Sequence, residues 1–243
     1  MLGKKFGETG WDNAEAEEST STKREYGPRR FWMPAGSTKR IMFLDSEPFC
    51  FFEHNLYAIT GEGKDKAVCL KKNGIDDRGC PLCDKEHWPS YIGYFSVIDM
   101  GDVSYDDEGA VLKGWTSSKG VTYQFGRSLY GAKRGGRDKP GVLPKLNRLA
   151  SKRGGTLAGT VWDVHRSGGK VESVGDEFEF IERVEPERWK DYLLDLGAAE
   201  DLLEIQPIDY GSVIVPKPYE DLQRLVGGGR PSGEGSRSEG ADY

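Results

Sequence analysis

The stretch that most constrains the fold reads Phe49-Cys50-Phe51-Phe52-Glu53-His54-Asn55-Leu56-Tyr57. Aromatic residues in such a short run favour a β-strand. Other short stretches along the chain have a similar strand-like character: residues 31–33, 40–44, 91–99, 121–125, 157–166 and 178–184. The sequence therefore predicts a mainly β protein, in which short strands form a small Greek-key barrel rather than a doubly wound sheet.

Helices are predicted mainly after this β core. One short helix falls at residues 142–152, and after Pro186 apolar residues recur three and four apart. A last helix begins at Pro218 and ends before Gly227. The layout expected from these patterns is a flexible tail (1–28), a β core (29–185), an acidic helical region (186–226) and a disordered Gly/Ser-rich tail (227–243).

The composition narrows the class of protein. Of 243 residues, 36% are hydrophobic and 30% are charged, but aromatic residues reach 11%, which is too many for a disordered chain. All apolar runs are far shorter than the ~20 residues of a membrane-spanning helix. The first five residues lack the apolar stretch of a signal peptide. We expect neither a membrane protein nor a secreted one.

The charge is strongly segregated along the chain. Residues 111–170 carry 13 Lys/Arg against only Asp138 and Asp163, a net charge of +11. Residues 1–110 have a net charge of −6, and residues 171–243 have a net charge of −11. This pattern predicts a polyanion-binding centre followed by an acidic region.

Aromatic residues alternate with the cations of this centre, which favours a nucleic acid as the polyanion. Cations neutralise phosphates, while exposed rings stack on unpaired bases. A second basic cluster lies just before the first strand. The residues expected at the nucleic-acid surface are Arg29, Arg30, Trp32, Lys39, Arg40, Trp115, Tyr123, Phe125, Arg127, Lys133, Arg134, Arg137, Lys139, Lys145, Arg148, Lys152, Arg153 and Arg166.

The cysteines predict one structural zinc ion. Two thiolates in Cys80-Pro81-Leu82-Cys83 are spaced to bind one ion from a tight turn. Cys69 and His54 complete a closed His-Cys₃ set, and Cys50 is then expected to be a small core residue. His87 and Cys50 remain alternatives to His54 as the fourth ligand.

We expect no enzymatic activity. The His-x-Glu and Pro-Cys-x-x-Cys signature of nucleobase deaminases is absent, as is His-Glu-x-x-His. The acidic residues between Asp99 and Asp107 resemble a solvated turn more than a magnesium site.

Taken together, these motifs resemble a known family. A strand at residues 39–45 precedes the His-bearing strand, the spaced cysteines follow, and residues 94–99 form a returning strand. Over roughly residues 29–185 the chain is similar to the zinc-containing single-stranded DNA-binding proteins of tailed bacteriophages, the T4-type helix-destabilising proteins.

The resemblance implies an OB-fold with a zinc subdomain inserted at about residues 54–90. It also implies His54, Cys69, Cys80 and Cys83 as zinc ligands, and sequence-independent coating of single-stranded DNA. Such proteins associate with themselves along DNA and recruit phage replication and recombination proteins through an acidic C-terminal region. They act in DNA replication, recombination and repair in the cytoplasm of the infected host.

An alternative function is a zinc-ribbon regulator that binds duplex DNA, or a replication or transcription adaptor. Duplex readers usually place a basic helix in the major groove. Here residues 142–152 provide the one short basic helix predicted from the sequence.

Overall fold

The structure is a computed structural model, and it describes residues 29–61, 65–107, 109–116, 122–136, 140–200 and 205–227. The predicted N-terminal tail (1–28) and residues 228–243 of the predicted C-terminal tail lie outside these ranges. No helix within them is long and apolar enough to cross a membrane.

The prediction of a mainly β protein is confirmed, because nine of the described strands join into one sheet with the central order β1-β9-β5-β2-β10-β11. The strands are β1 (Arg29–Arg30), β2 (Thr38–Phe43), β3 (Phe49–Asn55), β4 (Lys66–Val68), β5 (Ser90–Asp106), β6 (Gly109–Lys113), β9 (Gly126–Lys133), β10 (Thr160–His165) and β11 (Glu177–Arg183). A separate pair is formed by β7 (Trp115–Thr116) and β8 (Thr122–Tyr123). The large sheet is mixed, since β1 runs parallel to β9. It is also open, and the closed Greek-key barrel stays a prediction.

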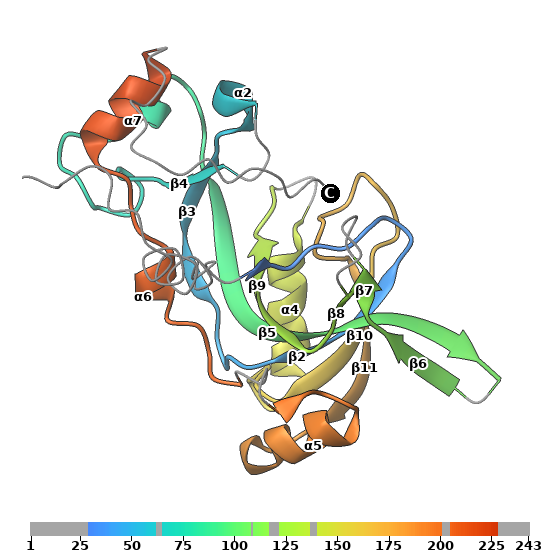
Figure 1. The fold of residues 1–243 in the computed structure, drawn as a ribbon. Helices are drawn as coiled ribbons and strands as arrows, with labels where there is room; N and C mark the ends of the chain where they lie inside the picture. The colour runs from blue at the N-terminus through green and yellow to red at the C-terminus, as the bar shows by residue number, and fades with distance from the viewer. Residues whose placement is uncertain are drawn as a thin grey trace, which may run out of the picture.

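β5 is the spine of the sheet (Figure 1). It pairs with β3 through its first residues, with β9 and β2 through its middle, and with β6 beyond Asp102. Beyond Asp102 the β5–β6 hairpin therefore projects from the body of the molecule. Gly101 has φ +102°, and a Cβ atom there would lie 2.5 Å from the carbonyl oxygen of Lys113. A glycine is thus needed at this position of β5, where the backbone at the end of β6 lies close to it.

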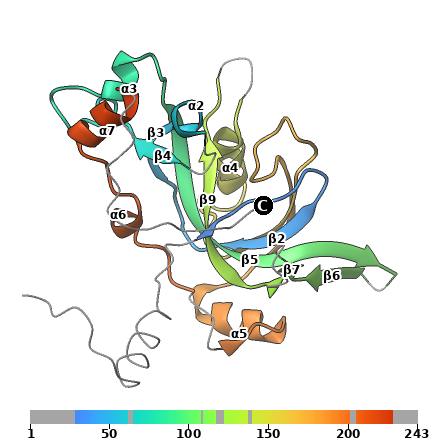
Figure 2. The same ribbon diagram turned by 45° about the horizontal axis from the view of Figure 1, so that its top comes forward.

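The helices that follow or interrupt the strands are all short. They are α2 (Tyr57–Thr60), α3 (Pro81–Asp84), α4 (Val142–Ser151), α5 (Trp189–Asp195, after a 3₁₀ turn at Pro186–Arg188), α6 (Tyr210–Val213) and α7 (Tyr219–Val226). α4 and α5 lie against different parts of the sheet (Figures 1 and 2). The inserted segment with α2 and α3 lies at one end, next to α7.

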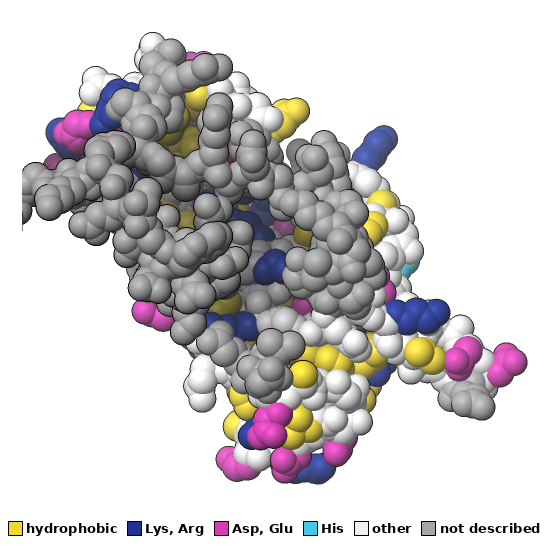
Figure 3. Space-filling model, viewed as in Figure 1, with side chains coloured by type: hydrophobic (Ala, Val, Ile, Leu, Met, Phe, Trp, Pro, Cys, Tyr) yellow, Lys and Arg dark blue, Asp and Glu magenta, His cyan; other side chains and the backbone are white. Residues whose placement is uncertain are grey.

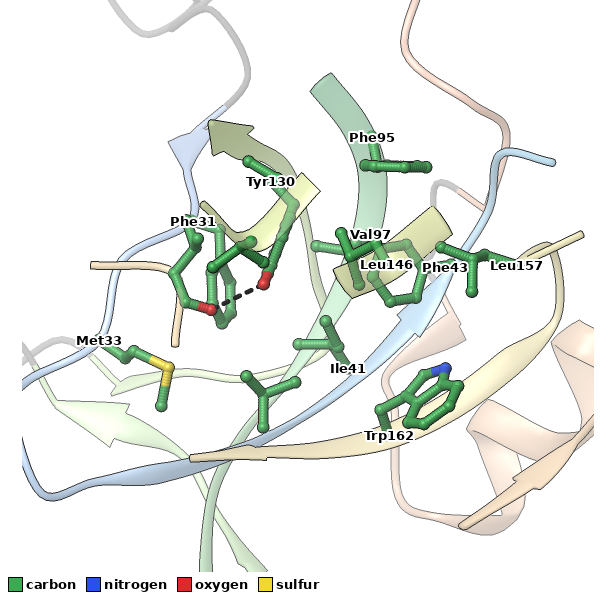
Figure 4. Packing of buried hydrophobic residues seen from close by; sticks show 14 residues of the cluster. Phe31, Met33, Ile41, Phe43, Phe95, Val97, Tyr130, Leu146, Leu157 and Trp162 are labelled. Carbon is green, nitrogen blue, oxygen red and sulfur yellow. Dashed lines mark hydrogen bonds between the residues drawn. The ribbon is translucent and has the colours of Figure 1, made fainter. Parts of the chain in front are cut away.

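Each face of the sheet carries its own apolar core because successive side chains of a strand point to opposite faces. In β2, Ile41 and Phe43 join the core beneath α4, whereas Met42 joins the core beneath α5. Trp162, Tyr130 and Leu146 are at most 1% exposed in the first core (Figure 4). The Tyr130 hydroxyl donates to the carbonyl of Val174 at 2.9 Å, so burial leaves this polar group paired.

One central strand, β9, is absent from the sequence-based assignment. Its residues contain two glycines and two cations, a composition that is typical of a loop. Instead Ser128, Tyr130 and Ala132 point to the interior. A Cβ atom on Gly131 would lie 2.8 Å from the Tyr94 ring, so this glycine permits the close approach of β5.

Candidate metal centre and cationic surface

The structure brings all four predicted zinc ligands together. The ligand atoms of His54, Cys69, Cys80 and Cys83 all lie within 4.8 Å of one another. His54 Nε2 is 3.5 Å from Cys80 Sγ and 3.8 Å from Cys83 Sγ, and the sulfurs of Cys69 and Cys83 are 3.5 Å apart.

These separations suit a tetrahedral ion. Zinc bound about 2.3 Å from sulfur and about 2.0 Å from nitrogen sets S–S edges of about 3.8 Å and N–S edges of about 3.5 Å. The cluster therefore has the donor set and the size of a structural metal site, with four protein ligands and no open position.

The four side chains come from β3, from the residue after β4 and from α3. His54 lies near the end of β3, and Cys69 directly follows β4, which pairs with β3. Cys80 is the N-cap of α3, and Pro81 begins this helix, where a missing N–H is tolerated. One turn later Cys83 faces the same centre, so the Cys-x-x-Cys spacing follows from a single helical turn.

Asn73 fixes the loop that carries Cys69. Its side-chain amide donates to the carbonyl groups of Phe52 (2.9 Å) and Cys69 (2.8 Å), and its carbonyl oxygen accepts from Phe52 N–H at 2.9 Å. The sequence around Asn73 carries no signal for this role. Its role becomes visible only when the loop folds back on β3.

Burial and neighbouring groups shift the pKa values of all four side chains in the cluster. Burial lowers the pKa of His54 to about 4, so its imidazole is neutral at pH 7. Burial raises the pKa of Cys69, and burial together with Cys69 raises that of Cys83 to about 12. Burial also acts on Cys80, but backbone N–H groups including that of Cys83 lower its pKa overall. A cation would displace the thiol protons and supply the charge that stabilises three thiolates.

Neither alternative ligand belongs to the cluster. His87 and Cys50 are both outside the group of four among the described residues. Cys50 is exposed on β3, which corrects the expectation that it is a core residue. It lies on the same face of β3 as His54, but near the start of the strand, where this face is still exposed.

α7 completes the apolar core around the metal ligands. Leu222 is fully buried in the same cluster as Cys69, Cys80 and Leu82. The predicted acidic helical region thus contributes one of its helices to the inserted module.

The structure divides the predicted nucleic-acid residues into several groups. Lys39 is 1% exposed and donates to Asp99 at 2.9 Å, and Phe125 is 5% exposed, so both lie in the interior where a nucleic acid does not reach. Arg40 forms a two-pronged pair with the buried Asp163, at 2.6 and 2.8 Å. These side chains hold the sheet together, and for Lys39 and Phe125 the predicted surface contact does not hold in this conformation.

Several other predicted cations reach the surface but also bond within the protein. Arg29 lies 4.0 Å from Asp99, and Arg30 lies 3.7 Å from Glu53 and bonds the Tyr94 hydroxyl. The remaining contacts are Arg127 to the carbonyl of Gln206, Arg166 to that of Met33, Lys145 to that of Asp176, and Arg153 stacked 3.6 Å from the Phe180 ring centre.

Four predicted cations are exposed and have no ion pair among the described residues: Lys133, Arg134, Arg148 and Lys152. The predicted aromatic residue Trp32 is exposed as well. Lys133 ends β9 and Arg134 follows it, and β9 contacts α4, which carries Arg148. The backbones of Trp115 and Tyr123 pair in β7–β8, but their side chains are not described. Arg137 and Lys139 lie outside the described residues.

On the face shown in Figure 3, Asp and Glu side chains gather over α5, where Lys and Arg side chains also lie, and at the tip of the β5–β6 hairpin, and several Lys and Arg side chains lie near the centre of the view. Comparisons with protein-family models, with curated proteins and with solved structures each found no match.

Proposed function

We propose that this chain binds single-stranded DNA without sequence preference on its cationic surface, and that one structural zinc ion holds the module at about residues 54–90. It is proposed to act as a binding protein and not as an enzyme.

One observation carries the DNA-binding proposal. Asp163 is the one acidic residue described between positions 111 and 170, and it is 3% exposed and paired with Arg40. The charge that this segment presents outward is therefore positive. The exposed side chains that contribute are Lys113, Lys133, Arg134, Arg148, Lys152, Arg153 and Lys170. The phosphates of a polyanion would offset the mutual repulsion of these cations, and the counterions released from the polyanion would favour binding.

The shape around these cations favours a single strand over a duplex. α4 has ten residues and buries Val142 and Leu146 against the sheet, so it is not free to enter a major groove. Trp32 is 43% exposed beside Arg30 and offers a ring on which an unpaired base can stack.

The zinc assignment is supported by the donor set and its spacing. Three thiols and one neutral imidazole at tetrahedral separations are typical of structural zinc. The ion would hold β3, β4 and α3 together; it would take no part in binding or in catalysis.

The finer parts of the proposal rest on the resemblance of the zinc spacing and flanking strands to phage single-stranded DNA-binding proteins. They are an OB-fold core, coating of DNA by many copies side by side, and a role in replication, recombination and repair in the cytoplasm of an infected bacterium. The acidic C-terminal region is proposed to contact replication and recombination proteins.

The test is a titration of the metal-loaded chain against labelled oligo-dT and a matched duplex at several salt concentrations. Tight binding to oligo-dT that weakens linearly with log salt, with quenched Trp fluorescence, is expected. A double variant, Arg148→Gln with Lys152→Gln, should weaken binding and reduce the salt slope, while Lys190→Gln on α5 should change neither. Stronger binding to the duplex would favour the duplex-binding regulator instead, and no binding to either would overturn both.

A further inference from the structure

A cavity of about 540 Å³ lies beside the exposed cations and has no role in the function proposed above. It opens between α4 and the β2–β3 connection. Its floor is formed by Phe95, Leu146 and Leu157, which come from β5, from α4 and from the segment before β10 and converge on one core (Figure 4). These three side chains are at most 2% exposed, so the floor is a fixed part of the fold.

The walls and rim of the cavity have different chemistry. Leu143, Pro144 and Ala150 extend the apolar surface along α4. Arg134 and Asn147 lie at the rim; both are exposed, and among the described residues neither side chain is hydrogen-bonded or ion-paired. An apolar pocket with a few unpaired polar groups at its mouth is the usual form of a small-ligand site.

We propose that this cavity receives one unpaired base of a bound single strand, with the adjoining phosphate at Arg134. The proposal rests on the proposed function and names a subsite within it. The cavity is large enough for a nucleobase, and its apolar floor would bury the flat ring. The amide of Asn147 can both donate to and accept from a base edge, which suits every base.

The charges at the mouth give the strand an orientation. Arg134 attracts a phosphate, and Arg148 follows Asn147 on the exposed side of α4. Glu47 also lines the cavity and is exposed, so it repels phosphate from the opposite rim. The backbone of the strand should therefore run along the α4 and β9 side, with a base turned inward.

The one exposed cysteine provides a direct probe of this cavity. A Cβ atom on Gly93 would lie 2.7 Å from Leu143, 2.9 Å from Pro48 and 3.3 Å from Cys50 Sγ. The Cys50 sulfur is thus next to two residues that line the cavity. The other three cysteines belong to the metal cluster and are buried.

The first experiment compares two ten-nucleotide strands that carry the same phosphates. One strand is entirely abasic, and the other has a single central thymine. Burial of one base should raise the affinity of the metal-loaded chain roughly tenfold. Ala150→Leu, which fills the cavity, should abolish this gain but keep the affinity for the abasic strand. Ser151→Leu introduces the same side chain at the exposed neighbouring position and should preserve the gain.

Each outcome separates the subsite from the proposed function. Equal affinity of the wild-type chain for the two strands, or a gain that persists in Ala150→Leu, would overturn the base pocket while leaving DNA binding by the cationic surface intact. No binding of either strand would overturn the proposed function itself. Circular dichroism and thermal unfolding show whether Ala150→Leu is folded.

The second experiment leaves the cavity unchanged. An oligonucleotide whose central thymine carries a short tether ending in a mixed disulfide should exchange with the Cys50 thiolate and release the small thiol. Capture at Cys50 should be at least tenfold faster than with the same tether on a terminal phosphate. It should also be tenfold faster than capture by Cys50→Ser with Ser212→Cys, which moves the thiol to α6. Equal rates would overturn the base pocket.

Discussion

The Arg78 guanidinium lies 2.6 Å from the Glu220 carboxylate and so joins the inserted module at about residues 54–90 to a helix 142 positions further along the chain. The same guanidinium is centred 4.2 Å from the Tyr219 ring centre. Leu222, on the same helix, is fully buried in one core with Cys69, Cys80 and Cys83. α7 is therefore part of the module in space, although the sequence separates them.

Removal of the metal should release α7. Loss of the ion leaves three buried thiols and a neutral imidazole without their common partner, so the core that Leu222 enters loosens. Hydrogen exchange after treatment with a chelator should accelerate in residues 66–84 and 219–226 together. α5 is the internal control, because its buried side chains lie in another core. Unchanged protection of α7 in the metal-free protein would contradict the coupling.

Leu222→Ala should lower the free energy of unfolding by about 2–5 kcal/mol, since it leaves a cavity in a closed apolar core. Arg78→Ala should have little effect, because the ion pair with Glu220 is exposed and screened by water. Urea denaturation of both metal-loaded variants makes the comparison. Equal losses would mean that the exposed ion pair stabilises the docking of α7 as much as the burial of Leu222 does.

The four ligands predict how substitutions change the metal content. Elemental analysis should find one zinc ion per wild-type chain, and Cys80→Ser should lose most of it because a hydroxyl does not replace a thiolate. Cys50→Ser and His87→Asn should both retain the ion, since neither residue is in the cluster. Loss of zinc in His87→Asn would mean that His87, and not His54, is the fourth ligand.

Asp163→Ala should destabilise the sheet by roughly 3–5 kcal/mol, because it leaves the partly buried Arg40 guanidinium without its carboxylate. Arg40→Gln should likewise reduce stability more than it reduces affinity for oligo-dT. Thermal unfolding and the oligo-dT titration, carried out on the same samples, separate the two effects. A large loss of affinity in Arg40→Gln with unchanged stability would mean that Arg40 contacts the nucleic acid.

Asp102 should make stability depend on pH. Burial raises its pKa above the ordinary value of 3.8; Lys39 opposes this effect and Asp99 adds to it. The folded state therefore holds this proton more tightly than the unfolded state does, and the stabilisation is lost as the pH rises through the folded pKa. Asp102→Asn removes this loss, so the variant should gain stability relative to the wild type from pH 4 upward. The denaturation curves of the wild type and of Asp102→Asn should coincide at pH 3.5 and differ at pH 7. The same difference in stability at both pH values would show that titration of Asp102 is not the cause.

The sequence predicted the metal ligands better than it predicted the cationic surface. The Cys-x-x-Cys turn has a fixed geometry, and the His54 strand could be recognised by its aromatic residues, so the four ligands could be found without coordinates. The position of Lys39 could not, because only the pairing of β2 with β5 places its ammonium beside Asp99 in the interior. Local composition records a charge but not the partner that a distant strand supplies.

The same limit applies to the fold. β2, β3, β10, β11 and α4 were predicted near their observed bounds because their local patterns are strong, whereas β4 and β6 lie outside the predicted stretches and residues 31–33 form no strand. β9 was missed because its glycines and cations are typical of a loop, and they form a strand only through long ladders with β5. The docking of α7 on the module depends on contacts across the whole chain, which no local pattern contains.

The place of Leu222 in the core of the module also has a consequence for the order of synthesis on the ribosome. Residues 49–94 emerge early and contain β3, β4 and all four ligands, so this module can bind its ion before most of the sheet exists. α7, which covers its apolar face, is made only roughly 7–26 s later at about 5–20 residues per second. During that time the apolar face of the module is exposed on the nascent chain. We expect chaperones that recognise apolar segments to bind the nascent chain there.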